Sequence, residues 1–225
     1  NAISDVVIGE RGKKLYIRTF AYSEEEYKST VGCIKHIKSD KVILMMKETP
    51  HDFFLTHPDN PYIRKMNRPT IVEFDSGNEY SGQGVVANTW PEYTMKRWGS
   101  YINCPNVTGY VARTDRYGDT SIVGTANEIQ LYALKRMTEE QTVSPMQIYN
   151  EFITSRYGED ALLPIRKAFQ NAYDIVTSVF YTLGTNLTDH SSLNYENNKW
   201  GYSRHVSGRW IDPPMVLVKH DINKT

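Results

Sequence analysis

Charged residues stand at or just beyond the carboxyl ends of the segments that are predicted to be β-strands. These candidates are Arg18, Lys47, Asp52, Glu79, Asp115 and Arg116. In parallel α/β proteins the active site lies outside the carboxyl ends of the strands, so these positions are the first to consider. Acids beside cations suit acid–base chemistry on an anionic substrate. Loops are commonly charged, however, so the pattern alone also fits ordinary solvated loop residues.

Four short segments rich in β-branched and aromatic residues position these candidates. They span residues 14–20, 41–46, 70–74 and 107–113. Turn-forming or charged residues bound each segment, which is typical of strands. A helix predicted over residues 23–39, with Ser23 and Glu26 as a capping box, joins the first two. A strand–helix–strand unit implies parallel pairing, and a shorter helix from Pro91 favours continuing it to the fourth strand.

The second half of the chain has a helical pattern. Helices are predicted over residues 121–138, 144–157 and 160–183, followed by a loop over 184–214 and an extended piece over 215–219. In the second of these helices Ser144 is the expected N-cap, Pro145 the first helical residue and Gly158 the stop.

This order of elements predicts an α/β fold, the second half of a (β/α)8 barrel of the TIM type. A complete barrel has eight strands and typically about 250 residues, whereas four strands are predicted here. We expect the half-barrel over residues 1–140 and a helical extension with an irregular C-terminal loop over residues 141–225. Open edges of a parallel sheet invite pairing, so we expect a missing N-terminal half or a partner chain to cover them.

Composition excludes several classes of protein. The 225 residues carry 26 basic and 26 acidic side chains, so no overall field attracts nucleic acid or anionic lipid. The longest apolar run, residues 42–46, is far short of the roughly 18 residues of a membrane-spanning helix. Cys33 and Cys104 form no zinc-binding pattern, and we expect no metal or cofactor. Trp90 and Trp98 are expected in the core rather than on a sugar platform.

Two motifs around the candidate residues resemble a known family. Lys47-Glu-Thr-Pro-His-Asp52-Phe53 is similar to a strand-end segment of the xylan-debranching α-glucuronidases, in which a lysine precedes an Asp-Phe pair by five positions. Residues 73–84, Glu-Phe-Asp-Ser-Gly-Asn-Glu-Tyr-Ser-Gly-Gln-Gly, resemble the family motif E-F-x(4)-E-Y-x-G-Q-G at nearly the family's separation. The second motif is the more specific one.

Weaker similarity extends to both sides of these motifs. The segment from Gly109 to Asp115-Arg116 resembles the family's G-T-D-R segment, and the helix after it keeps part of the family pattern. Arg18-Thr-Phe20-Ala-Tyr22 is similar to the W-R-x-F-V-Y strand. The resemblance covers about residues 12–160 and is strongest over residues 47–84.

The resemblance implies an inverting glycoside hydrolase that releases a glucuronic-type uronic acid from a polysaccharide or oligosaccharide. It implies that Asp52 and Glu79 activate water on the sugar face opposite the leaving group, and which of them is the base stays open. It also implies that Arg18 and Lys47 hold the uronate carboxylate, with Asp115 and Arg116 in the same substrate site.

The family's general acid stands upstream of the segment that matches Arg18, so we expect this chain to be inactive, or nearly so, by itself. Two alternatives accompany this interpretation. A non-catalytic carbohydrate-binding or structural fragment is the alternative function, and a related family with another acidic sugar fits nearly as well. Binding alone would need the cations and aromatics but not both Asp52 and Glu79, which favours the enzyme.

Overall fold

The computed structural model describes residues 2–19, 21, 24–50, 52–82, 86–115 and 121–181. The first half contains α1 (Ala2–Ser4), a π-helical turn η1 (Asp5–Glu10), β1 (Leu15–Thr19), α2 (Glu24–Lys35), β2 (Val42–Lys47), η2 (Ile63–Lys65), β3 (Thr70–Asp75), α3 (Pro91–Tyr101) and β4 (Val107–Arg113). The second half contains η3 (Ala126–Glu128), α4 (Ile129–Glu139), α5 (Pro145–Tyr157), η4 (Glu159–Ala161), α6 (Leu162–Gln170) and α7 (Ala172–Phe180).

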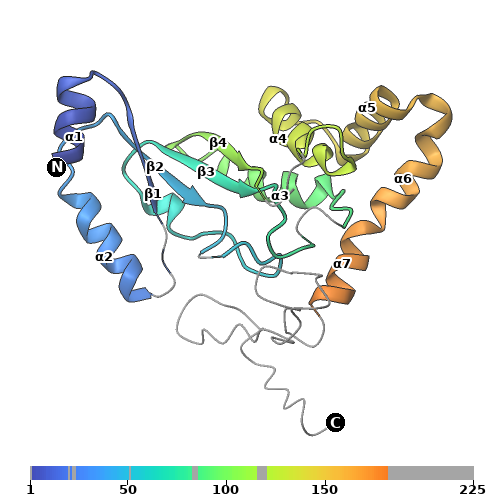
Figure 1. Cartoon of the computed structure of the whole chain (residues 1–225), viewed down its shortest axis with the longest axis horizontal. Helices are drawn as coiled ribbons and strands as arrows, with labels where there is room; N and C mark the ends of the chain where they lie inside the picture. The colour runs from blue at the N-terminus through green and yellow to red at the C-terminus, as the bar shows by residue number, and fades with distance from the viewer. Residues whose placement is uncertain are drawn as a thin grey trace, which may run out of the picture.

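The four strands form one parallel sheet in the order β1-β2-β3-β4, so the chain is of the α/β class (Figure 1). Each predicted strand is confirmed to within a residue or two at its ends. The parallel pairing is confirmed as well, and it aligns Arg18 with Met45 and Lys47 with Glu73. The carboxyl ends of all four strands therefore lie along one edge of the sheet.

Helices cover one face of the sheet and form the main core there. Side chains alternate across a strand, and Leu44 and Phe74 on this face are buried against Tyr27 of α2, Trp98 of α3 and Leu134 of α4. In the view of Figure 1, α2 lies to the left of the strands, and α3 to α7 lie to the right. Trp90 and Trp98 are both buried, which confirms their expected place in cores.

The opposite face of the sheet carries a row of charged residues near the carboxyl ends. Arg18, Lys47, Glu73, Asp75 and Arg113 alternate with the apolar residues of the helix-covered face, and the strand register puts them on the same side. Parallel strands buried on both faces are normally apolar throughout. The charged row is thus the departure from an ordinary buried sheet.

The helical half follows its capping signals closely but not everywhere. Ser144 caps α5 in a capping box with Gln147, Pro145 begins the helix and Gly158 ends it at a φ of 85°, as predicted. The helix predicted from residue 121 begins only after Gly124, whose φ of 92° is outside the helical region.

The single helix predicted over residues 160–183 is wrong, because the chain breaks at Asn171 into α6 and α7. The side-chain amide of Asn171 donates to the Lys167 carbonyl. The backbone N–H of Asn171 donates to the Ala168 carbonyl, three residues back, instead of continuing the α-helical pattern of hydrogen bonds. The predicted loop over 184–214 and extended piece over 215–219 lie outside the described residues. Among the helices that are described, none has both the length and the apolar character to cross a membrane.

A buried arginine of α3 fixes the long connection between β2 and β3. Arg97 Nη1 lies 3.0 Å from Asp59 Oδ1, and Arg97 also donates to the His57 carbonyl. Its Nε lies 3.9 Å from Glu48 Oε2. Because one guanidinium contacts the start and the middle of this connection, α3 determines where the residues that follow β2 lie.

Replacing Arg97 with methionine should therefore lower the free energy of unfolding by about 3 to 5 kcal/mol, because the buried Glu48 and the partly exposed Asp59 lose their partner. Urea denaturation at about pH 8, where carboxyls of ordinary pKa are ionised, measures this loss. The matched control is Arg64→Met: Arg64 is exposed and donates to the Ser100 carbonyl. Its loss should be about 0.5 kcal/mol or less, and equal losses would refute the anchoring role of Arg97.

Candidate functional site

The candidate residues that the structure describes gather at the carboxyl edge of the sheet. Arg18 lies in β1, Lys47 ends β2, and Asp52, Glu79 and Asp115 follow β2, β3 and β4. Arg116 lies outside the described residues, as do the motif residues Phe20, Tyr22, His51, Gln83 and Gly84. Contacts between the side chains decide which of the candidates belong to one site.

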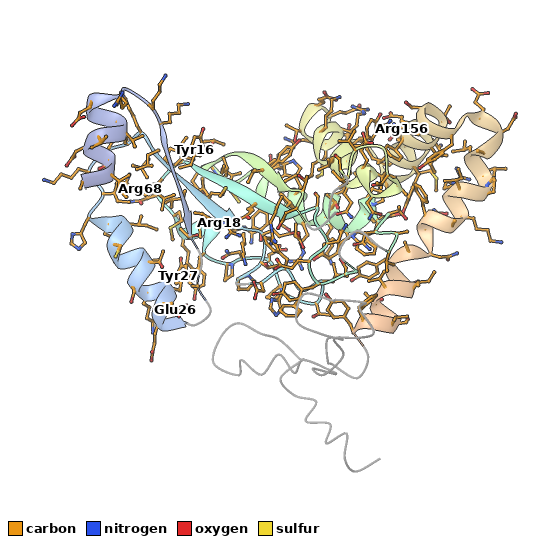
Figure 2. The ribbon with its side chains drawn as sticks, viewed as in Figure 1. Tyr16, Arg18, Glu26, Tyr27, Arg68 and Arg156 are labelled. Atoms are coloured by element: carbon orange, nitrogen blue, oxygen red, sulfur yellow. The ribbon has the colours of Figure 1, made fainter. Side chains whose placement is uncertain are left out.

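Arg18 forms a two-point ion pair with Glu73. Its Nε and Nη2 lie 2.7 and 2.8 Å from the two carboxylate oxygens, which is the strong fork-to-fork geometry of arginine and carboxylate. The Glu73 side chain is 5% exposed, whereas 40% of the Arg18 side chain is exposed. Arg18, labelled in Figure 2, is therefore held by a buried acid while part of its side chain is exposed.

Lys47 and Asp52 form a second pair, which is buried. Lys47 Nζ lies 2.8 Å from Asp52 Oδ1, and the lysine side chain is only 4% exposed. Burial lowers the pKa of Lys47, and the neighbouring Asp52 acts in the opposite direction. The ammonium also lies 4.6 Å from the centre of the Phe53 ring, an attractive cation–π distance. The loop after β2 thus folds back over the last residue of that strand.

Arg113 at the end of β4 binds the remaining two candidates. Its Nε and Nη2 donate to Asp115 at 2.6 and 2.8 Å, and its Nη1 donates to Glu79 Oε2. The Arg113 guanidinium lies 5.6 Å from the centre of the same Phe53 ring that Lys47 contacts. Phe53 therefore joins the pair that contains Asp52 to the group that contains Glu79 and Asp115.

Sequence reasoning missed Glu73, Arg113 and Phe53 as members of this cluster. Glu73 and Arg113 belong to strands, whereas the candidates were sought mainly among the residues that follow each strand. A signal was present, because a charged residue inside an otherwise apolar strand must face a partner or water. Phe53 belongs to the Lys47–Phe53 motif, but the motif does not indicate that its ring contacts two cations.

The turn after β3 sets the backbone of Glu79. The Glu79 N–H donates to Asp75 Oδ2 at 2.7 Å, and Asn78 takes a left-handed conformation with φ of 57°. Gly77 is packed against the next strand's end: a Cβ there would lie 2.3 Å from the Asp115 backbone oxygen. The turn and the residue after β4 are thus in close contact.

Two acids beneath this turn have strongly raised pKa values. Burial raises the pKa of Asp75 to about 7, against the opposing effect of Arg113 and of the bond from the Glu79 N–H. Burial likewise raises the pKa of Glu48 to about 7, against the opposing effect of Arg97. Asp75 is half-buried as a residue, but its Oδ1 atom is buried. Both acids therefore hold protons up to about neutral pH.

The arrangement brings cations and acids together at one edge of the sheet. Arg18 offers an exposed cation beside a fixed carboxylate, and Asp52 and Glu79 each contact a cation. Among the described residues no group of three or more His, Cys, Asp or Glu side chains is placed to hold a metal ion. No protein-family model matches the sequence, and a comparison with curated proteins finds no match.

Replacing Gly77 with alanine should lower the free energy of unfolding by about 1 to 3 kcal/mol, because its Cβ forces apart the two strand ends. Urea denaturation measures this change. The control is Gly32→Ala in α2, where an added Cβ meets nothing within 4 Å and should stabilise the helix by about 0.5 to 1 kcal/mol. A neutral Gly77→Ala variant would show that the close approach to Asp115 is not required.

Asp75 should make the fold less stable as pH rises. Its pKa is about 7 in the folded chain and near 3.8 otherwise, so its favourable contribution is complete below about pH 4 and is lost as pH rises through 7. Between these limits one such group changes the free energy of unfolding by up to about 1.4 kcal/mol per pH unit.

Asp75→Asn should therefore flatten the fall in stability between about pH 5 and pH 8, measured by urea denaturation across that range. Asn keeps an oxygen that can accept from the Glu79 N–H. The exposed Asp160→Asn variant is the control and should keep the slope of the parent chain. An unchanged slope in Asp75→Asn would contradict the raised pKa.

Proposed function

We propose that this chain forms the second half of a (β/α)8 barrel of an inverting glycoside hydrolase that releases a glucuronic-type uronic acid from a polysaccharide or oligosaccharide. The observation that carries the proposal is the linked cluster at the carboxyl edge of the sheet. There Lys47 with Asp52 and Arg113 with Glu79 meet across Phe53.

The sheet topology supports the barrel part of the proposal. A doubly wound sheet reverses its strand order and carries helices on both faces, whereas here the order β1-β2-β3-β4 is sequential. The main helix-covered core lies on one face, and the charged row lies on the other. In a barrel the helices lie outside, and active-site residues come from the ends of several strands.

In the proposed reaction, Asp52 and Glu79 orient a water molecule, and one of them accepts its proton as the water attacks the anomeric carbon. The glycosidic bond breaks on the opposite face, which inverts the configuration. Protonation of the leaving oxygen requires a third acid, which the proposal places on an upstream strand.

Recognition of the uronate is assigned to the cations of the cluster. Arg18 is the best placed, because it is held by Glu73 and is 40% exposed. Lys47 is buried and contributes its charge from beneath the surface. Asp115 and Arg116 complete the proposed substrate site beyond β4.

Binding without hydrolysis is the second candidate function. The observation in its favour is that Asp52 and Glu79 each bind a cation of the same chain, an arrangement that also serves to build a rigid binding edge. The two functions share the recognition of a uronate and differ in whether the acids are needed for turnover.

D-Glucuronic acid should bind the chain more tightly than D-glucose does, and Arg18→Met should weaken its binding by at least about tenfold, because a charge-assisted bond is lost. Calorimetric titration measures both. Arg156→Met is the matched control, since Arg156 also pairs with a carboxylate and is 42% exposed, but at the far end of the molecule (Figure 2). Equal affinity for the two sugars, or an equal effect of both variants, would defeat the proposal.

In a protein with the complete barrel, Asp52→Asn or Glu79→Gln should lower the rate of hydrolysis by about 10²-fold or more. The affinity for glucuronic acid should stay within about twofold, because neither acid is assigned to bind the carboxylate. Retained turnover in both variants would remove the catalytic assignment. Absence of turnover in the parent protein, with affinity for the uronate intact, would favour the binding function.

A further inference from the structure

A small cavity lies directly beneath the turn that carries Glu79. Its volume is about 20 Å³, which is the space that one water molecule needs. Polar residues from several elements line it together with aromatic ones; among the polar ones are Glu48, Asp75, Ser76, Asn78, Thr94 and Gln130. It thus joins the end of β2, the end of β3 and the helices α3 and α4.

Two of the residues that line this cavity each have a carboxyl oxygen without a hydrogen-bond partner within the part of the chain that is described. They are Glu48 Oε2 and Asp75 Oδ1, and both atoms are buried. Glu48 as a whole is 5% exposed. Buried carboxyl oxygens are almost always hydrogen-bonded in native proteins, so each such atom needs an explanation.

Neighbouring donors are already used elsewhere. The Glu79 N–H binds the other oxygen of Asp75, and the Gln130 amide donates to Asn78 Oδ1 and to the Asn88 carbonyl. Arg97 Nε lies 3.9 Å from Glu48 Oε2, beyond hydrogen-bond distance. Both oxygens thus belong to residues that line a space of the size of a water molecule.

We propose that this cavity is a binding site for one internal water molecule, which bridges Glu48 Oε2 and Asp75 Oδ1. A water has two O–H donors and two acceptor positions, so it can donate to both oxygens when they are ionised and accept a hydrogen bond from whichever carboxyl is protonated. The bridge ties the end of β2 to the turn after β3. The site rests on the cavity and on the two oxygens, and it does not depend on the proposed hydrolase function.

The charges around the cavity favour water over a cation. Arg97 faces Glu48, with Asp59 behind it, and Arg113 faces Asp75, with Glu79 and Asp115 beside it. Each carboxyl therefore already has a guanidinium near it, which opposes a second positive charge. The raised pKa of both acids points the same way, because protonated carboxyls hold water and not metal ions.

A crystal structure of the chain at high resolution tests the site directly. We expect one ordered density peak at about 2.6 to 3.2 Å from both Glu48 Oε2 and Asp75 Oδ1, the range of hydrogen bonds to water. A direct bond between the two carboxyl groups with no peak would overturn the proposal. Ligand distances of about 2.0 to 2.4 Å, typical of a bound cation, would overturn it as well.

Oxygen-17 relaxation dispersion tests the same site in solution, because it counts long-lived internal waters. Glu48→Met removes one of the two bridged oxygens and should lower the count by one, whereas Asp75→Asn keeps an oxygen or amide for the water and should leave the count unchanged. Equal counts in the parent and in Glu48→Met would overturn the proposal. Should Glu48→Met fail to fold, the crystal structure of the parent chain decides.

Discussion

The buried ammonium of Lys47 is the charge on which the carboxyl edge of the sheet depends. A lysine that is 4% exposed cannot remain charged without a partner, and Asp52 supplies one only if the loop after β2 turns back over the strand. Within that loop the Asn60 amide donates back to the Lys47 carbonyl, and Arg97 of α3 holds the loop from outside through Asp59. The ion pair of the buried Lys47 with Asp52, together with the contacts of Asn60 and Arg97, therefore fixes the path of the connection between β2 and β3.

The same requirement links elements that are distant in the sequence. Arg18 of β1 pairs with Glu73 of β3, and Arg113 of β4 pairs with Glu79 in the turn after β3. Buried and half-buried ion pairs add little net stability but are costly to break. Their value here is positional: each pair holds two strand ends in register, so the charged edge behaves as one unit.

The strands, and the edge of the sheet where the candidate residues gather, could be predicted from the sequence, but the pairing of the charges could not. β-Branched and aromatic residues mark β1 to β4, and the strand–helix–strand order implies that their carboxyl ends meet. Which acid pairs with which cation depends on the strand register and on how each side chain turns. The register places Glu73 beside Lys47, yet the side chain of Glu73 binds Arg18. The break at Asn171 was missed for a related reason, since a side chain that competes with the backbone leaves helical periodicity intact.

Asp75 and Glu79 are four residues apart yet meet different surroundings. Glu79 lies against the Arg113 guanidinium, whereas the Oδ1 atom of Asp75 is buried and burial raises the pKa of Asp75 to about 7. The charge of Glu79 contributes to that raised pKa, and such an interaction is reciprocal. A change of charge at Glu79 must therefore shift the proton on Asp75, which makes Asp75 and the charged edge parts of one electrostatic system.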